Sequence, residues 1–246
     1  MDISGKVALI TGASEGIGLA TARLFAEQGA RLALAARSAE RLERVAADLP
    51  EAMAVPTDMR DEAAVRRMVA RTRERYGRVD VLINNAGQGL HVPIEQVDLA
   101  QYRAVFELNV VGVIAAMQAV IPVMREQGGG VIVNISSGTS KMVIPGVGPY
   151  ASTKYALNAI TLTARQELAG EHIRVGLVYP GIAGTAFHEH LANLADGGTW
   201  GGPRSRAGAM PPDTAESVAA KILEAVQTEA AEVYLESVKA VAQRSS

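Results

Sequence analysis

The sequence contains no cysteine, and this absence excludes disulfide bonds, thiolate catalysis and cysteine-ligated metal sites. It also has no excess of positive charge, because 24 Lys and Arg residues are balanced by 26 Asp and Glu residues, for a formal net charge of -2. A protein without a global positive field does not attract phosphate backbones, so nucleic acid is not expected as a partner. Residue spacing typical of metal ligands is also missing, and we expect no metal.

The chain lacks a long uninterrupted apolar run. Its most apolar stretch, residues 110–123, is broken by Gln118 and Pro122 and falls short of the roughly 18–20 apolar residues that a membrane-spanning helix needs. The first residues contain no basic stretch followed by an apolar segment, so no signal peptide is expected. We therefore expect a cytoplasmic protein with no membrane partner.

Short apolar segments alternate with helical patterns, which predicts βαβ units and a parallel sheet covered on both faces. Hydrophobic residues make up 48% of the chain, enough to bury such a sheet. We predict an α/β fold: a Rossmann-like, doubly wound parallel sheet of seven strands with helices on both faces, in a single domain spanning residues 1–246. The predicted strands are residues 6–11, 31–36, 52–57, 79–83, 131–136, 173–179 and 232–235. The predicted helices are residues 17–28, 39–49, 61–76, 99–127, 149–169 and 214–228.

Helix-capping residues mark several of these boundaries. Ser38, Asp61 and Thr214 each precede a helical pattern and are expected to cap it. Pro149 suits the first turn of a helix. Residues 182–212 are rich in glycine and proline and follow no helical or strand period. Long loops of this kind are usually lids or binding loops, so we expect a substrate loop here, with Trp200 near its tip.

A glycine-rich segment, T-G-A-S-E-G-I-G at residues 11–18, joins the first predicted strand to the first predicted helix. Gly12 would allow a tight turn, Gly16 a close backbone approach to a pyrophosphate, and Gly18 close packing of helix on sheet. The helix N-terminus would offer N–H groups and a positive dipole to the phosphates. The spacing differs from the general G-x-G-x-x-G fingerprint. A glycine-rich surface turn is the alternative interpretation, which the flanking strand and helix disfavour.

Further short motifs follow the later strands in order. They are Asn84-Asn85-Ala86-Gly87, Asn109 with Gly112, Ser137, the Tyr150-x-x-x-Lys154 pair, and Pro180-Gly181 with Thr185. Together with the glycine-rich segment, this set resembles the short-chain dehydrogenase/reductase family over essentially the whole chain. The resemblance implies an NAD(P)-dependent oxidoreductase acting on CH–OH donors, which transfers a hydride between nicotinamide and a ketone or secondary alcohol.

An independent physical argument supports a site at one edge of the sheet. Gly12, Asp58, Asn85, Ser137 and Pro180 fall just after the first, third, fourth, fifth and sixth predicted strands. In open parallel sheets, ligands bind outside the carboxyl ends of the strands. The five motifs are therefore expected to converge on one edge.

Tyr150 and Lys154 are four residues apart, which places both side chains on one helix face. A free tyrosine has a pKa near ~10. A neighbouring ammonium and the positive end of the helix are both expected to lower that pKa and let the phenol exchange a proton with an alcohol. The alternative is an amphipathic helix whose lysine side chain extends to the surface. The presence of Ser137 and Asn109 in the same chain disfavours this alternative.

The remaining catalytic roles are implied by the family resemblance. Ser137 would hold and polarise the substrate oxygen, and Lys154 would also contact the nicotinamide ribose. Asn109 would hold a water that links Lys154 to solvent. Ser136 competes with Ser137, but consecutive strand residues face opposite ways, so only one can reach the site. The family spacing favours Ser137, which leaves Ser136 as backbone support.

The second predicted strand ends in Ala35-Ala36-Arg37 and lacks the carboxylate that selects NAD. Arg37 can form forked contacts with a 2′-phosphate, and Ser14 could add a hydroxyl donor. We therefore predict NADP(H), with NAD(H) as the alternative. Glu15 occupies a position that is often basic in NADP-preferring relatives, and its carboxylate could repel the phosphate or pair with Arg37. Arg37 could also be an ordinary solvated charge.

The resemblance implies a set of cofactor contacts, among which Asp58 would accept a hydrogen bond from the adenine amine beside the Met59 backbone. The set is Gly12, Ser14, Glu15, Gly16, Ile17, Gly18, Arg37, Ser38, Asp58, Met59, Asn85, Ala86, Gly87, Tyr150, Lys154, Pro180, Gly181, Ala183 and Thr185. The expected substrate pocket is mostly apolar. It comprises Gln88, Leu90, His91, Thr139, Met142, Val143, Ile144, Phe187, His188, Leu191 and Leu194.

This pocket predicts a ketone or secondary alcohol with an apolar body, handled by a carbonyl reductase or a 3-oxoacyl-thioester reductase. We do not expect His91, His188 or His190 to be catalytic, because lone loop histidines are more often structural or at the surface. The helices at residues 99–127 and 149–169 are expected to form a homo-tetramer or homo-dimer. The alternative function is a non-catalytic nucleotide-binding regulatory or scaffold protein of the same fold.

Overall fold

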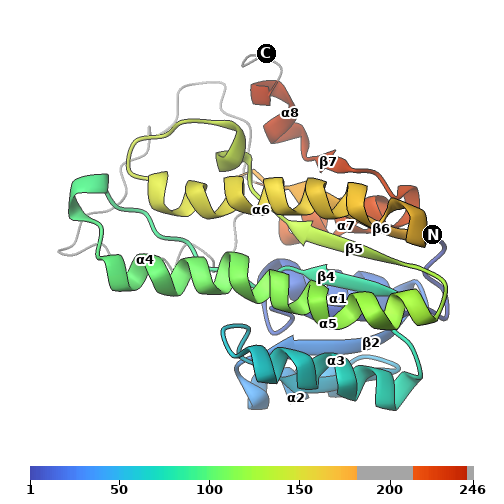
Figure 1. The fold of residues 1–246 in the computed structure, drawn as a ribbon. Helices are drawn as coiled ribbons and strands as arrows, with labels where there is room; N and C mark the ends of the chain where they lie inside the picture. Colours follow the sequence, from blue (N-terminus) through green and yellow to red (C-terminus); the bar gives the residue numbers. More distant parts are fainter. Residues whose placement is uncertain (182–212, 243–246) are drawn as a thin grey trace.

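The computed structural model describes residues 1–181 and 213–242, which form a parallel sheet of seven strands in the order β3-β2-β1-β4-β5-β6-β7 (Figure 1). Every neighbouring pair is parallel. The strand order reverses between β1 and β4, as in a doubly wound sheet. The strands are β1 Val7–Thr11, β2 Arg31–Ala36, β3 Ala52–Pro56, β4 Val81–Asn84, β5 Gly130–Ile135, β6 Ile173–Tyr179 and β7 Glu232–Tyr234. The predicted Rossmann-like α/β fold is confirmed.

Alternate strand residues supply two separate apolar layers, because successive side chains point to opposite faces of the sheet. Ile10 packs in the layer that includes Phe25, whereas the neighbouring Leu9 packs in the layer that includes Met68. Figure 1 shows α1 and α7 behind the sheet and α3, α5 and α6 in front of it. The rear helices are α1 Gly16–Glu27, α2 Ala39–Ala47 and α7 Ala215–Thr228. The front helices are α3 Glu62–Tyr76, α4 Leu99–Phe106, α5 Gly112–Glu126 and α6 Gly148–Glu167.

Several short elements complete the described chain. The 3₁₀ helices are η1 Ile94–Gln96, η3 Gly138–Lys141 and η4 Ala169–Glu171, and the last helix is α8 Glu236–Ala242. Asp61 and Thr214 cap α3 and α7 as predicted, each accepting hydrogen bonds from backbone N–H groups of the first turn. Ser38 precedes α2, but its side chain makes no capping hydrogen bond, so that prediction is wrong.

The long helix predicted at residues 99–127 is not a regular α-helix. It consists of α4, a π-helical segment η2 at Glu107–Val111, and α5. Gly112 follows this segment, and a Cβ there would lie 2.3 Å from the carbonyl oxygen of Met59. Glycine therefore permits a close contact between the helix and the segment after β3. Insertions of this type change the direction of side chains and are frequent at functional sites.

By length and composition, the combined helix from Leu99 to Glu126 could cross a membrane, which corrects the expectation that its apolar stretch is too short. Half of its most apolar window is nevertheless buried inside the protein. Val113, Ala116 and Val120 belong to the apolar layer in front of the sheet. Packing against the sheet and α3 thus accounts for much of the apolar character of this helix.

Candidate active site

The carboxyl ends of the strands place the predicted motifs along one edge of the sheet. Gly12, Asn85 and Pro180 directly follow β1, β4 and β6, and Ser137 lies two residues beyond β5. Because all seven strands are parallel, these ends share one edge. Pro180 and the turn after β5 are also joined directly, since the Gly138 N–H donates to the Pro180 carbonyl at 2.7 Å. The sequence-based convergence of motifs is therefore present in the fold.

Glycine is favoured at two positions of the glycine-rich loop for different reasons. Gly12 has φ +66°, in the left-handed region. A Cβ on Gly18 would lie 2.1 Å from the Gly12 carbonyl oxygen. Helix α1 begins at Gly16, and the residue before it, Glu15, makes no side-chain cap. The N–H groups of the first turn are thus left for an anionic ligand, which fits the pyrophosphate of a dinucleotide.

Asn85 fastens this loop to the neighbouring strand. Its Nδ2 donates to the carbonyl oxygens of Thr11 and Gly12, at 3.0 and 3.3 Å. The backbone N–H groups of Asn85 and Ala86 both donate to Thr11 Oγ1 at 3.0 Å. We call this set of bonds the Asn85 lock. It fixes the loop after β1 to the loop after β4, and Thr11 is a member that the sequence-based prediction omitted.

Ser137, Tyr150 and Lys154 come together at the carboxyl end of β5. Their exposed fractions are 7%, 6% and 5%. The side chains of Ser137 and Tyr150 form a hydrogen bond. Lys154 lies one turn after Tyr150 on α6, with its Nζ 5.8 Å from the centre of the phenol ring. That ammonium donates to the carbonyl oxygen of Ile135 at 2.8 Å.

Burial shifts the pKa values of both ionisable groups in this cluster. It raises the pKa of Tyr150 to about 12, against the smaller, opposite influence of the hydrogen bond with Ser137. Burial lowers the pKa of Lys154 to about 8. In both cases low polarity disfavours the charged form. The sequence-based expectation of a lowered Tyr150 pKa is therefore wrong in this structure, because the removal of the phenol from water dominates.

Asn109 lies in η2 and is completely buried. Its Oδ1 accepts from the Gln88 N–H at 2.9 Å, and its Nδ2 donates to the Gln88 carbonyl at 2.9 Å and to Thr153 Oγ1 at 3.1 Å. Asn109 thus ties the segment after β4 to α6. A Cβ on Gly87 would lie 3.3 Å from Asn109 Oδ1 and 3.7 Å from Lys154 Nζ. Glycine at position 87 therefore relieves a tight approach to Asn109 in the neighbourhood of the lysine, and the water relay through Asn109 stays a prediction.

His91, an expected pocket residue, lies directly beside Tyr150. It is only 7% exposed, and its ring lies edge-on to the Tyr150 ring, with 5.8 Å between the ring centres. This burial excludes a surface position and is compatible with a structural role, and the expectation that His91 is not catalytic stays a prediction. Of the other expected pocket residues, Leu90 is buried, whereas Val143 is 97% exposed. Ala183, Thr185, Phe187, His188, His190, Leu191, Leu194 and Trp200 lie outside the described residues.

Gly181 follows β6 and is held by the segment that begins at residue 213. The Gly181 N–H donates to Asp213 Oδ2 at 2.7 Å, and the Ser237 hydroxyl donates to the same oxygen at 2.8 Å. A Cβ on Gly181 would lie 2.3 Å from Ser237 Oγ. The absence of a side chain at this position therefore lets α8 approach the end of β6.

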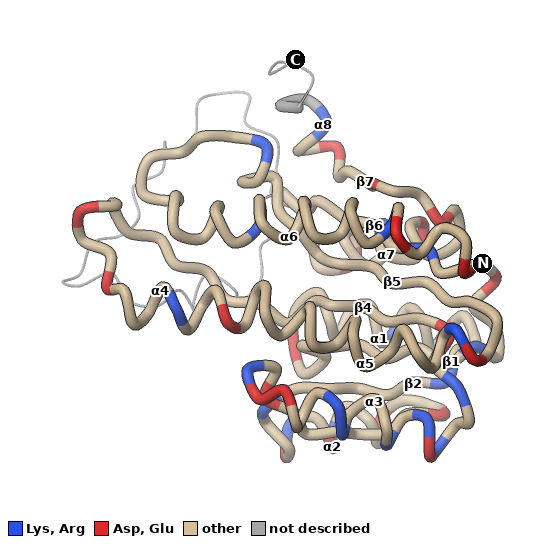
Figure 2. The backbone as a smooth tube through the Cα atoms, viewed as in Figure 1, with Lys and Arg blue, Asp and Glu red and all other residues tan. Residues whose placement is uncertain are grey.

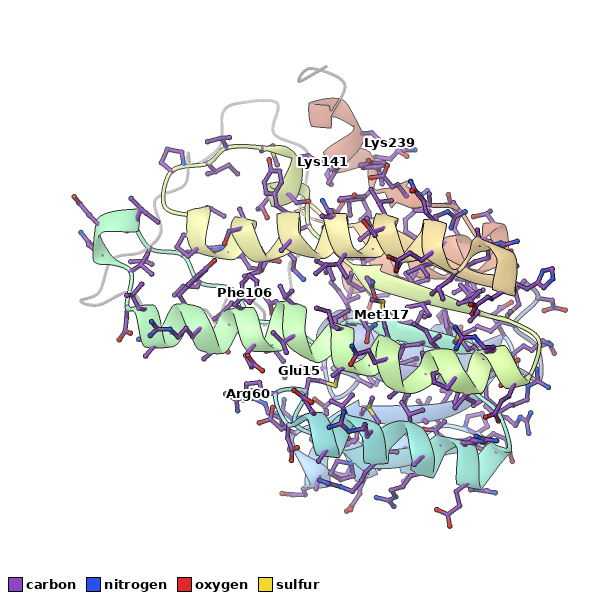
Figure 3. All side chains as sticks on the ribbon, viewed as in Figure 1. Glu15, Arg60, Phe106, Met117, Lys141 and Lys239 are labelled. Carbon is purple, nitrogen blue, oxygen red and sulfur yellow. The ribbon has the colours of Figure 1, made fainter. Side chains whose placement is uncertain are left out.

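Charged side chains gather where the loops after β1, β2 and β3 meet. Arg37 is exposed directly after β2. The Glu15 carboxylate pairs with Arg41 of α2. Asp58 accepts hydrogen bonds from Arg60, which holds the pKa of the Asp58 carboxyl below its usual value, and the charge of Arg37 acts in the same direction. Figure 3 shows Glu15 and Arg60 at the end of the sheet toward which the strand arrows of Figure 1 point.

The family model for short chain dehydrogenases matches residues 6–194. The chain belongs to the short-chain dehydrogenase family. It is 37% identical over 202 residues to the 3-oxoacyl-(acyl-carrier-protein) reductase of Thermotoga maritima, which covers 79% of this chain and 81% of the relative. The family assignment favours an enzyme over the non-catalytic nucleotide-binding alternative.

Two solved structures of short-chain dehydrogenase relatives share the fold. A short chain dehydrogenase/reductase of Burkholderia phymatum in complex with NAD superposes with a TM-score of 0.87 at 27% identity, covering 99% of this chain and 93% of the other. A 3-ketoacyl-(acyl-carrier-protein) reductase of Brucella melitensis complexed with NADH superposes with a TM-score of 0.75 at 33% identity, covering 77% and 81%. This short-chain dehydrogenase is thus an NAD(P)-dependent oxidoreductase.

Proposed function

We propose that this enzyme reduces a ketone with an apolar body, or oxidises the corresponding secondary alcohol, with Tyr150 as the proton-transferring group. The observation that carries the proposal is the buried hydrogen bond between Tyr150 and Ser137, with Lys154 one helical turn away. A phenol and a hydroxyl side by side can bind one substrate oxygen together. The loops after β1, β4 and β6 would hold the dinucleotide.

The protonation states favour the reductive direction. A nicotinamide cofactor held by this chain would supply the hydride for the carbonyl carbon. With a pKa of about 12, the Tyr150 phenol carries its proton at neutral pH and can give it to the carbonyl oxygen. Ser137 donates a hydrogen bond to the same oxygen. Lys154, with a pKa of about 8, is mostly charged at pH 7 and stabilises the phenolate that remains until solvent returns a proton.

The test of this chemistry is NADPH consumption with a panel of apolar ketones and 3-oxoacyl thioesters. The two reductase relatives favour the thioesters as a second candidate substrate class. Tyr150→Phe should reduce kcat by about 10²- to 10⁴-fold, the usual contribution of a positioned acid–base group. NADPH binding should survive the substitution. A wild-type protein that binds NADPH and reduces no member of the panel would instead support the nucleotide-binding alternative.

We further propose NADP(H) as the preferred cofactor. Arg37 is the exposed residue at the end of β2, and no carboxylate stands there. The Glu15 carboxylate is paired with Arg41, which reduces its repulsion of a phosphate. The two superposed relatives are named with NAD and NADH, so the preference has to be measured on this chain.

A fluorescence titration of both nucleotides decides the cofactor preference. Arg37→Ala should raise the Kd for NADPH by about 10- to 100-fold, the size of a lost charge-assisted hydrogen bond, and leave the Kd for NADH unchanged. Arg44→Ala, which removes another exposed arginine, is the matched control and should change neither. Tighter binding of NADH than of NADPH by the wild-type protein would contradict the proposal.

We also propose a cytoplasmic homo-tetramer or homo-dimer, with residues 182–212 as the substrate loop of a single domain. The tube in Figure 2 is mostly tan along the middle of α5 and α6, which means that few of the residues there are Lys, Arg, Asp or Glu. Only half of the most apolar window in Leu99–Glu126 is buried within one chain. A second copy would cover the remaining apolar surface. Sedimentation of the purified protein as a monomer would contradict this proposal.

A further inference from the structure

A closed polar network lies behind Ser137. The Ser140 hydroxyl donates to the Ser137 carbonyl oxygen at 2.6 Å, and Asn158 Nδ2 donates to Ser140 Oγ at 2.9 Å. The Ser136 hydroxyl donates to Asn158 Oδ1 at 2.6 Å. Ser136, Ser140 and Asn158 are 3%, 1% and 8% exposed. Hydrogen bonds that are withdrawn from water in this way hold a narrow geometry, because an unpaired partner would be costly.

The position of Asn158 on α6 joins this network to the reactive groups. Tyr150, Lys154 and Asn158 follow one another at intervals of four residues, so they lie along one face of the helix. The helix that carries the phenol and the ammonium therefore also holds the turn that carries Ser137. The Asn158 Oδ1 accepts from Ser136, and its Nδ2 donates to Ser140. The two bonds therefore hold the chain on both sides of Ser137.

The turn fixes the direction of the Ser137 hydroxyl. Ser137 Oγ accepts hydrogen bonds from the Thr139 N–H at 3.2 Å and from the Thr139 hydroxyl at 3.0 Å. With its two acceptor positions occupied, the hydroxyl hydrogen of Ser137 is left to point at Tyr150. A shift of the 137–140 turn would therefore misdirect the donor that holds the substrate oxygen.

We propose that Asn158 is a positioning residue for the reaction, which aligns the Ser137 hydroxyl with Tyr150 through Ser136 and Ser140. Asn158 does not touch the reacting atoms and acts only through Ser137. This inference rests on the proposed function of the Ser137 and Tyr150 pair. It predicts that Asn158 and Ser137 contribute to kcat as one unit, so that their substitutions are not additive.

Asn134 provides a matched control for Asn158. It is also a buried asparagine that joins β5 to α6, with its Nδ2 donating to Thr161 Oγ1 at 2.8 Å and its Oδ1 accepting from Asn84 Nδ2 at 2.8 Å. None of these bonds involves the turn at Ser137. Asn134→Leu and Asn158→Leu therefore remove similar buried bonds, and only Asn158→Leu frees the turn.

The experiment measures kcat, KM, NADPH affinity and Tm for both leucine variants, alone and combined with Ser137→Ala. Asn158→Leu should lower kcat by about tenfold and leave NADPH affinity within about twofold, and it should cause no further loss in the Ser137→Ala background. Asn134→Leu should lower Tm without the loss of kcat. An unchanged kcat in Asn158→Leu, or a loss that multiplies with that of Ser137→Ala, overturns the proposal.

Ser140→Ala supplies a smaller change that removes the same link, and its crystal structure gives a readout that does not depend on turnover. The Ser137 Oγ should move out of hydrogen-bond distance of the Tyr150 hydroxyl in this variant, as in Asn158→Leu. An undisturbed contact would overturn the positioning role. The same structures decide the question if the wild-type protein reduces none of the substrates tested, in which case only the proposed function has failed.

Discussion

The two halves of the carboxyl edge of the sheet differ in how their polar side chains can act on a ligand. In the half formed by the loops after β1, β2 and β3, Arg37 is exposed and Asp58 and Arg60 form a partly exposed ion pair. In the half formed by the loops after β4, β5 and β6, Ser137 and Tyr150 are almost completely buried. Exposed charges act through attraction that salt weakens, whereas buried groups act through desolvation and fixed hydrogen bonds. The first half is suited to attracting the charged groups of a nucleotide and the second to proton transfer.

Among the experiments that compare the two halves, the one with the largest expected effect tests whether the nucleotide half depends on close backbone approach. Gly18→Ala places a Cβ 2.1 Å from the Gly12 carbonyl oxygen, so the loop must shift. We expect a roughly 10- to 100-fold rise in the Kd for NADPH, in line with the usual cost of overpacking, measured by fluorescence titration. Gly170→Ala is the control, because nothing lies within 4 Å of its added Cβ. Normal NADPH binding by Gly18→Ala would show that the loop tolerates a side chain.

The next effect concerns the ammonium in the buried half. Lys154 has a pKa of about 8, so it is charged below that pH and neutral above it. Reduction should therefore slow above pH 8, with kcat approaching a tenfold loss per pH unit once deprotonation controls the rate. Lys154→Arg keeps a positive charge at all these pH values and should remove the decline. If the kcat of the wild-type protein stays constant up to pH 10, the role assigned to the Lys154 charge is contradicted.

The same shift predicts how stability changes with pH. The pKa of Lys154 is about 8 in the folded protein, against 10.5 for an ordinary lysine, so the unfolded chain binds more protons between these two values. The cost of burying the charge is fully present below pH 8 and disappears above 10.5. The contribution of Lys154 to the free energy of unfolding should therefore rise through this window. Comparison with Lys154→Met by denaturant titration isolates that contribution.

A moderate effect should distinguish the two halves by their response to salt. Raising the ionic strength from about 0.01 M to about 0.5 M screens charges near Arg37 but not those buried beside Tyr150. We expect the Kd for NADPH to rise severalfold more than the Kd for NADH. The pKa that controls kcat should stay within a few tenths of its low-salt value. Equal changes in the Kd of both nucleotides would contradict the idea that exposed charges near Arg37 contribute to NADPH binding.

The smallest expected effect concerns His91, which contacts the Tyr150 ring edge-on. His91→Phe keeps a ring at this position and should change kcat by less than about threefold. His91→Ala removes the contact, worth about 0.5–1.5 kcal/mol in comparable ring pairs, and should reduce kcat further. Steady-state kinetics of the two variants gives the comparison. A large loss of similar size in both variants would mean that the ring nitrogens of His91 take part in the reaction.

The sequence was sufficient to predict the sheet and the edge where the motifs meet. Apolar periodicity and capping residues such as Asp61 locate the elements, and parallel strands then bring Gly12 and Ser137 to one side. Burial was harder to predict, because spacing places Lys154 near Tyr150 without showing that both leave water. The pKa of Tyr150 was consequently expected to fall, whereas it rises.

The periodicity of the sequence also could not predict the irregular helical elements. A π-helical insertion such as the one at Asn109 keeps the same composition as the α-helix around it, so no pattern marks it. Asn158 was missed because a single asparagine on a helix has no motif of its own. Its spacing of four residues from Lys154 was a usable signal, since it placed a polar group on the reactive face of the helix.

The Asn85 lock has a consequence for how this enzyme can diversify. It joins the glycine-rich loop to the segment beside Lys154, so we expect a substitution within the lock to alter nucleotide affinity and turnover together. Arg37 and Arg41 take no part in these bonds. With the role proposed for Arg37, we expect that substitutions at such outlying positions change the cofactor preference and leave the reaction itself unchanged.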